Sequence, residues 1–208
     1  MTRLFAGIGL SLLVGGSAAG AAEPASPMRT LVYSVTSSSH CAGRFNGDEH
    51  ATLRIAVVGR PTPDSLLTDV TYTADNVTQP ATRVAIFTDG TLGFQTFLCR
   101  QAAWVLSPLA VGLVGSPQFA PGQSWHVNAF NATPRGDAWY RVDSVDHDRA
   151  VIAINDWRGA RDGRPLQGTM TYATDAAVPV SVTVEGSSGY VEARLVSDTT
   201  PNSPTPAR

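Results

Sequence analysis

The sequence contains no lysine, since all 15 of its basic residues are arginine. This absence excludes any mechanism that needs a Schiff-base lysine or the lysine of a phosphate-binding loop. Charge is also scarce: charged residues make up 15% of the 208 residues, and the formal net charge is −2. We therefore expect neither a nucleic-acid-binding protein, which would be strongly basic, nor a disordered acidic chain. The length fits one domain with tails.

Long apolar runs are missing as well, and the run at the N-terminus is too short to cross a membrane as a helix. It extends from Leu4 to Val14, follows the positively charged Arg3, and precedes small residues that include Ala19-Gly20-Ala21. This order is typical of a secretory signal peptide, here residues 1–22. The sequence predicts an exported protein, periplasmic or extracellular, without a membrane span. An uncleaved anchor is the alternative.

Cysteine is limited to two residues, Cys41 and Cys99. An exported protein meets an oxidising compartment, and two cysteines allow a single intramolecular pairing. The alternative is a reactive Cys41 thiol with His40 as its base. Neighbouring residues of an extended chain point to opposite faces, which is poor geometry for such a pair. We therefore predict a disulfide between Cys41 and Cys99.

The signatures of common catalytic sites are absent. Residues 122–126 resemble a nucleophile elbow but end in His126 where the motif needs glycine. No His-Glu-x-x-His, Cys-x-x-Cys or Gly-x-Gly-x-x-Gly after a strand occurs. Ser124 and His126 share a strand face, and Asp137 could complete a hydrolase triad with them. Proximity in the sequence is the only support for this alternative. We predict that the protein is not an enzyme and uses no cofactor.

A metal site is not expected either. The best cluster of potential ligands combines His40 with Asp48, Glu49 and His50, at a spacing that zinc motifs do not use. Residues 143–148 are acidic but lack the glycine and the terminal glutamate of a calcium loop. Both stretches are interpreted as polar connections between strands.

Alternation of apolar and polar residues, typical of β-strands, is the dominant pattern from Arg29 onward. About eleven such segments follow one another at intervals of about 8–15 residues, which favours a sandwich or barrel. Turn-forming residues separate several of them, as at Asp89-Gly90, 146–148 and 186–189. The predicted fold is mainly β, a single antiparallel sheet curled into a half-barrel or barrel. The positions that mark these segments include Leu31, Tyr33, Val35, Leu53, Ile55, Val57, Val70, Tyr72, Val84, Ile86, Trp125, Val127, Tyr140, Val142, Ile154, Met170, Tyr172, Val182, Val184, Val191, Ala193 and Leu195.

One apolar segment, Gln101–Leu113, does not alternate. It is too short to span a membrane, and Pro108 lies within it. The sequence leaves two possibilities open, a short helix broken at Pro108 or a buried apolar loop. Because the segment separates two groups of strands, we expect it to plug or line a concavity. The predicted ligand-lining residues are Trp104, Leu106, Leu109, Leu113 and Trp125.

The second half of the chain, residues 117–196, resembles a family of uncharacterised exported envelope proteins. The similarity rests on Phe119-Ala-Pro-Gly-Gln-Ser-Trp125 leading into a strand, the hairpin at Asp146-His147, and the stretches 168–172 and 179–182 with Asp175. That fold is similar to the periplasmic lipoprotein-sorting carriers. The resemblance implies a curved antiparallel sheet with an apolar concave face, plugged by a helix or loop, that accepts acyl chains. No site residue is transferred from it.

Two functions from different classes follow as hypotheses. The first is an exported domain, residues 23–197, that binds a lipid-like or other apolar ligand in the concave face of the half-barrel. The second is a structural or protein-interaction domain of the envelope, with a filled core and no small ligand; its partner is unknown. Residues 198–208 are polar and proline-rich, and we expect a disordered tail there.

Overall fold

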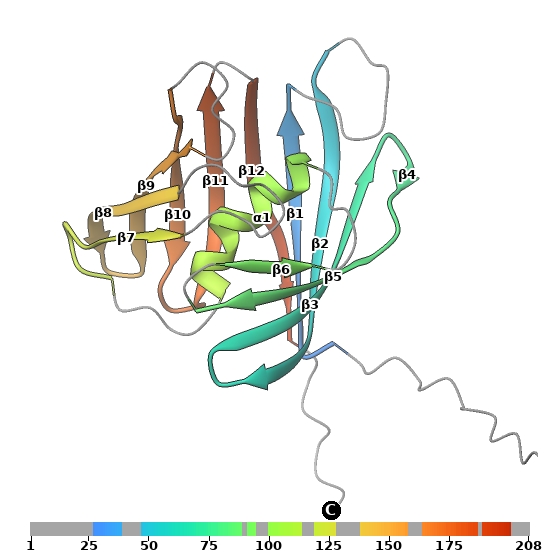
Figure 1. Ribbon diagram of the computed structural model, residues 1–208, viewed down its shortest axis with the longest axis horizontal. Coiled ribbons are helices and arrows are strands. Elements are labelled where there is room, and N and C mark those ends of the chain that lie inside the picture. The colour runs from blue at the N-terminus through green and yellow to red at the C-terminus, as the bar shows by residue number, and fades with distance from the viewer. Residues whose placement is uncertain are drawn as a thin grey trace, which may run out of the picture.

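The computed structural model describes residues 27–38, 47–88, 91–94, 100–113, 119–127, 138–157, 164–186 and 189–200. These residues form one large antiparallel sheet and one helix, which confirms the predicted mainly β fold (Figure 1). The helix is α1 (Arg100–Leu113). The strands are β1 (Arg29–Ser37), β2 (Glu49–Thr62), β3 (Ser65–Ala74), β4 (Val77–Thr78), β5 (Thr82–Phe87), β6 (Leu92–Phe94), β7 (Ser124–Val127), β8 (Ala138–Asp146), β9 (Arg149–Asp156), β10 (Leu166–Ala173), β11 (Val178–Gly186) and β12 (Gly189–Thr199).

The strand order explains how the sheet is built. It runs β6-β5-β3-β2-β1-β12-β11-β10-β9-β8-β7, with β4 paired to β3. The first and last strands, β1 and β12, therefore pair side by side in the middle of the sheet. The chain meanders from β1 out to the β6 edge and returns from the β7 edge to β12. Since β6 and β7 do not pair among the described strands, the sheet is an open half-barrel and not a closed barrel.

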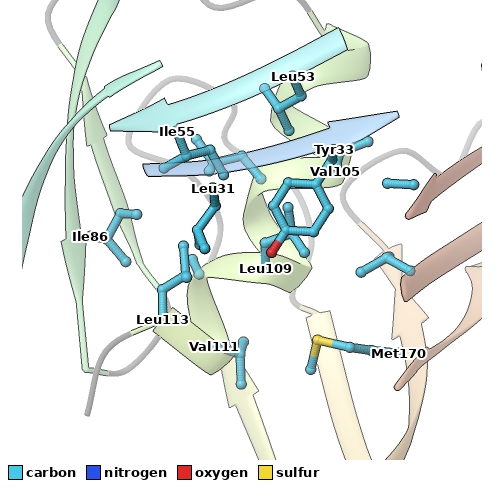
Figure 2. Close-up of a cluster of buried hydrophobic side chains, with 14 of the residues drawn as sticks. Leu31, Tyr33, Leu53, Ile55, Ile86, Val105, Leu109, Val111, Leu113 and Met170 are labelled. Carbon is cyan, nitrogen blue, oxygen red and sulfur yellow. The ribbon is translucent and has the colours of Figure 1, made fainter. Parts of the chain in front are cut away.

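Helix α1 lies on the inner side of the curled sheet, where Figure 1 shows it in front of β1 and β12. It follows β6 and precedes β7, the two edge strands, so the chain crosses from one edge to the other through the concavity. The helix contacts β5, β11 and β12. Figure 2 shows its Val105, Leu109 and Leu113 among inward side chains of β1, β2 and β5.

The alternation predicted from the sequence matches the burial of the strands. In β1, Leu31, Tyr33 and Val35 are buried while Ser34 between them is exposed, and β3 shows the same rhythm. Fully burying an aliphatic side chain of this size gains about 1.5–3 kcal/mol, so these inward faces supply the core. The outward faces are largely polar.

Turn chemistry sets the ends of several strands. The predicted turn at 146–148 joins β8 to β9, and His147 takes a positive φ of 41° there. A further turn between β3 and β4 was not predicted; its Asp75 and Asn76 have φ of 48° and 64°. Two consecutive left-handed residues suit a tight hairpin, and Asp and Asn tolerate that region better than most residues. Asp89-Gly90 lies outside the described residues.

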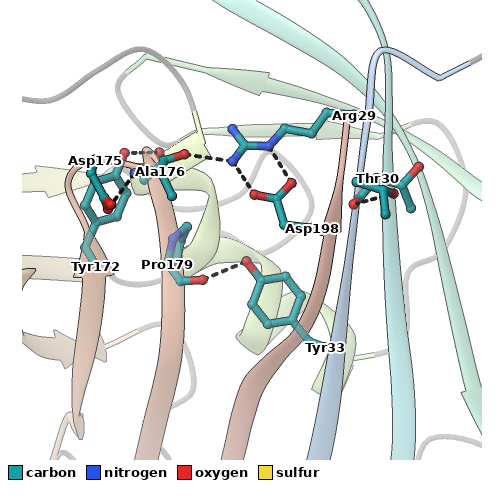
Figure 3. A network of polar contacts seen from close by, with 10 residues as sticks. Arg29, Thr30, Tyr33, Tyr172, Asp175, Ala176, Pro179 and Asp198 are labelled. Atoms are coloured by element: carbon teal, nitrogen blue, oxygen red, sulfur yellow. Dashed lines mark hydrogen bonds and ion pairs between the residues drawn. The ribbon is translucent and has the colours of Figure 1, made fainter. Parts of the chain in front are cut away.

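Polar contacts at one end of β1 tie three segments together (Figure 3). Arg29 donates from Nε and from a terminal nitrogen to the two carboxylate oxygens of Asp198, at 2.9 and 2.6 Å, and to the carbonyl of Ala176 at 2.7 Å. The hydrogen bond to Asp198 is the main reason that the pKa of Arg29 is raised. The sequence predicted that the tail begins at residue 198. In the structure, Asp198 and Thr199 instead belong to β12.

Among the described residues, no helix is both long and apolar enough to cross a membrane. The predicted signal peptide, residues 1–22, lies outside the described part of the chain, as do residues 201–208 of the predicted tail.

Candidate functional site

The concave face of the sheet is the candidate site, and α1 occupies it. All nine residues of the helix whose side chains are described, 105–113, are buried. Leu106 and Leu109 are both 0% exposed, and Leu113 is 8% exposed. A helix that is apolar on every side must be enclosed on every side. The inner face of the half-barrel therefore provides the environment that this segment requires.

The sequence of α1 makes it dependent on that enclosure. Pro108 lies inside the helix. The first turn has no acidic residue and the last turn has no basic residue, so neither end complements the helix dipole. Proline in a helix interior costs about 3 kcal/mol relative to alanine, and Gly112 adds about 1 kcal/mol. The possibility of a break at Pro108 is corrected by the structure, because the helix continues through it. Burial, not intrinsic helix propensity, holds this segment in shape.

A close contact joins the end of α1 to the sheet at Gly112. The Tyr172 hydroxyl of β10 donates a hydrogen bond of 2.8 Å to the Gly112 carbonyl. A Cβ placed on Gly112 would lie 2.4 Å from Cε2 of Tyr172 and 2.9 Å from Cγ of Pro179. Glycine is thus required here for the helix to approach β10 and β11. Burial raises the pKa of the Tyr172 hydroxyl to about 12, so the hydroxyl stays protonated and able to donate.

A second buried tyrosine crosses the inner face at the level of β11. Tyr33 of β1 is 0% exposed, and its hydroxyl donates to the Pro179 carbonyl at 2.9 Å (Figure 3). Burial raises the pKa of Tyr33 far above its usual value. Tyr33 and Tyr172 therefore act as neutral hydrogen-bond donors that fix β11 and α1 against the rest of the sheet.

Four aromatic side chains gather at the β7 end of the inner face. The Phe119 ring packs edge-on against Tyr172, with centroids 4.9 Å apart, and stacks on Trp125 at 6.0 Å. Trp125 in turn stacks on Tyr140 at 5.5 Å. Phe119 and Trp125 are half-buried, whereas Tyr140 and Tyr172 are each 1% exposed. Here the apolar interior meets solvent. The sequence singled out Trp125 but not the cluster, which forms only once β7, β8 and β10 are in register.

The predicted ligand-lining residues divide into three groups. Leu106, Leu109 and Leu113 lie inside the half-barrel, packed between α1 and the strands. Trp125 belongs to the half-exposed aromatic cluster. The side chain of Trp104 lies outside the described residues. The inner leucines contact other core residues, so they would line a cavity only if α1 moved.

A buried carboxylate lies at the other end of the inner face. Glu49, which begins β2, is 2% exposed, and one of its oxygens accepts a hydrogen bond of 2.6 Å from the Tyr72 hydroxyl. Burial, followed by this hydrogen bond, raises the pKa of Tyr72. Asp48 and His50, its neighbours in the candidate metal cluster, are exposed. Strand alternation therefore separates these side chains. Among the described residues, no group of three or more acidic, histidine or cysteine side chains is placed to hold a metal ion.

The residues of the hydrolase alternative lie on the outside of the sheet. Ser124 and His126 of β7 are both exposed, and the His126 ring stacks on Trp139 of β8 with centroids 4.9 Å apart. Asp137, His40, Cys41 and Cys99 lie outside the described residues. The disulfide therefore stays a prediction.

No known family model matches the sequence. No curated protein matches it either.

Proposed function

We propose that the protein is an exported envelope domain whose half-barrel is permanently filled by its own helix, and that it acts as a structural or protein-interaction domain and not as a carrier. The burial of every described side chain of α1 supports this proposal above all. The secretory signal sequence and the paired cysteines, Cys41 and Cys99, are further parts of it and rest on the sequence alone.

The energy needed to empty the concave face argues against a carrier. Displacing α1 would expose five buried aliphatic side chains, Val105, Leu106, Leu109, Val111 and Leu113. At about 1.5–3 kcal/mol each, this costs at least ~8 kcal/mol. A ligand shifts such an equilibrium only by its difference in affinity for the two states, and ~8 kcal/mol equals the whole binding free energy of a micromolar ligand.

One observation favours the second candidate, binding of a lipid-like or other apolar ligand. The half-exposed rings of Phe119 and Trp125 stand where the inner face opens to solvent, next to the end of α1. An apolar chain could enter there only by replacing part of the helix. The helix itself has no acidic residue in its first turn and no basic residue in its last turn to complement its dipole.

Titration with oleate, followed by tryptophan fluorescence and by native mass spectrometry, distinguishes the two candidates. We expect no saturable binding and no co-purified lipid, because every described side chain of α1 is already buried in the concave face. Trp125→Phe serves as the control for the optical signal. Saturable oleate binding with a fluorescence change that Trp125→Phe removes would support the carrier and contradict our proposal.

A further inference from the structure

The side of the sheet opposite α1 carries an aligned row of side chains. From β7 to β12, one outward residue of each strand lies in register with the next: His126 with Trp139, Trp139 with Asn155, Asn155 with Gln167, Gln167 with Glu185, and Glu185 with Tyr190. We name this row, from Trp139 to Tyr190, the outer strip. Neighbouring strands lie about 4.8 Å apart, so the strip is about 19 Å long. The residues of the outer strip are Trp139, Asn155, Gln167, Glu185 and Tyr190.

Each end of the outer strip carries an aromatic residue: Trp139 is exposed and Tyr190 is half-buried. Trp139 is 47% exposed, and its ring stacks on His126, which fixes its orientation. At the other end, Tyr190 is half-buried, and a hydrogen bond with Asp48 is the main reason that its pKa is raised. Its backbone amide donates to Ser38 Oγ at 2.8 Å, which holds the strand end in place. A partly exposed aromatic ring that is held in a fixed orientation offers a partner a flat apolar surface on which to stack.

The middle of the outer strip is polar and has open space on both sides. Gln167 and Glu185 border a hollow of about 700 Å³ that Arg164 and Tyr190 also line. On their other side they border a second hollow, of about 370 Å³, together with Thr169 and Thr183. Amide, carboxylate and hydroxyl groups therefore face solvent between the two aromatic ends.

This combination selects the chemical class of the partner. The strip itself has one acidic residue and no basic one, so it lacks the clustered positive charge that a nucleic acid or phosphate would need. The polar middle is unsuited to a lipid, whose sites are mostly apolar. A sugar ring has an apolar face that can stack on an aromatic ring, as amphipathic aromatics permit, and hydroxyl groups that can pair with amides and carboxylates.

We propose that the outer strip binds an extended, uncharged oligosaccharide that runs across the strands from β8 to β12. Sugar rings would stack on Trp139 and Tyr190, and their hydroxyl groups would hydrogen-bond to Asn155, Gln167 and Glu185. This site lies on the opposite face from α1 and is independent of what the concave face contains.

Calorimetric titration of the full chain with cellohexaose, hexa-N-acetylchitohexaose and glucose tests this site. We expect at least one hexasaccharide to bind, and glucose to bind much more weakly because a single ring reaches one aromatic end only. Trp139→Ala should weaken binding about tenfold, in line with the upper range for aromatic stacking. Gln167→Ala should weaken it several-fold. Phe87→Ala is the matched control, because Phe87 is an exposed aromatic residue of β5, at the far side of the sheet.

Three results would overturn the proposal. The first is no binding of either hexasaccharide at millimolar concentration. The second is an equal loss of affinity in Trp139→Ala and Phe87→Ala while Gln167→Ala is unchanged. The third is self-association of the parent, seen by sedimentation, that Trp139→Ala abolishes in the absence of saccharide binding, since that would make the strip a contact between copies of this chain. Oleate binding does not affect any of these outcomes. The proposal for the outer strip and the proposal for the filled concave face can therefore be contradicted independently of each other.

Discussion

Leu109→Asp is expected to abolish cooperative folding. The Leu109 side chain is 0% exposed and lies between α1 and the inward side chains of the sheet (Figure 2). An aspartate there would bury a charge without a partner, which costs several kcal/mol even after its pKa rises. Domains of this kind are stable by about 5–15 kcal/mol in total, so the variant should be largely unfolded by circular dichroism and lose its thermal transition.

Val77→Asp is the matched control, because Val77 of β4 is 53% exposed and the same chemical change adds no buried charge. Its melting temperature should stay close to that of the parent. A folded Leu109→Asp protein with a melting temperature near the parent value would mean that α1 can leave the interior at little cost, contrary to our account.

Gly112→Ala is expected to destabilise the protein, although alanine is the better helix former. In a loosely held helix the change would stabilise by up to about 1 kcal/mol. Here the new methyl group would overlap the Tyr172 ring, whose hydroxyl is hydrogen-bonded to the carbonyl of the same glycine. Overpacking of this kind costs about 1–3 kcal/mol, so we expect a net loss in the free energy of unfolding measured in urea.

The sign of the effect therefore reports how tightly α1 is packed. Gly59→Ala in β2 is the control, since a Cβ at that position meets no atom within 4 Å and should change stability little. If Gly112→Ala raised the free energy of unfolding while Gly59→Ala left it unchanged, the contact between α1 and Tyr172 would not be a fixed part of the core.

Much of the fold could be predicted because strand alternation is local. The spacing of positions such as Leu31, Tyr33 and Val35 predicts an inward face without any knowledge of the neighbouring strands. The state of α1 could not be predicted in the same way. Proline disfavours a continuous helix locally, so Pro108 predicts a break. Only the burial of the segment by the sheet compensates for that cost.

The sites depend on strand register, which the sequence does not display. Phe119 and Tyr172 are far apart in the chain, and their contact needs β7 to β10 in their observed order. The outer strip was missed for the same reason. Trp139, Gln167 and Tyr190 each look like an isolated outward residue until four strand pairings place them in one row. A shift of one residue in any pairing would turn part of that row inward.

Native-state hydrogen exchange of the α1 amides tests most directly whether the half-barrel is permanently filled. The amides of residues 105–113, apart from Pro108, should exchange only through global unfolding, with the same free energy of opening as the central strands β1 and β12. The result that would contradict the account is exchange of the α1 amides through a separate opening of much lower free energy while β1 and β12 stay protected, because the helix would then leave an intact half-barrel.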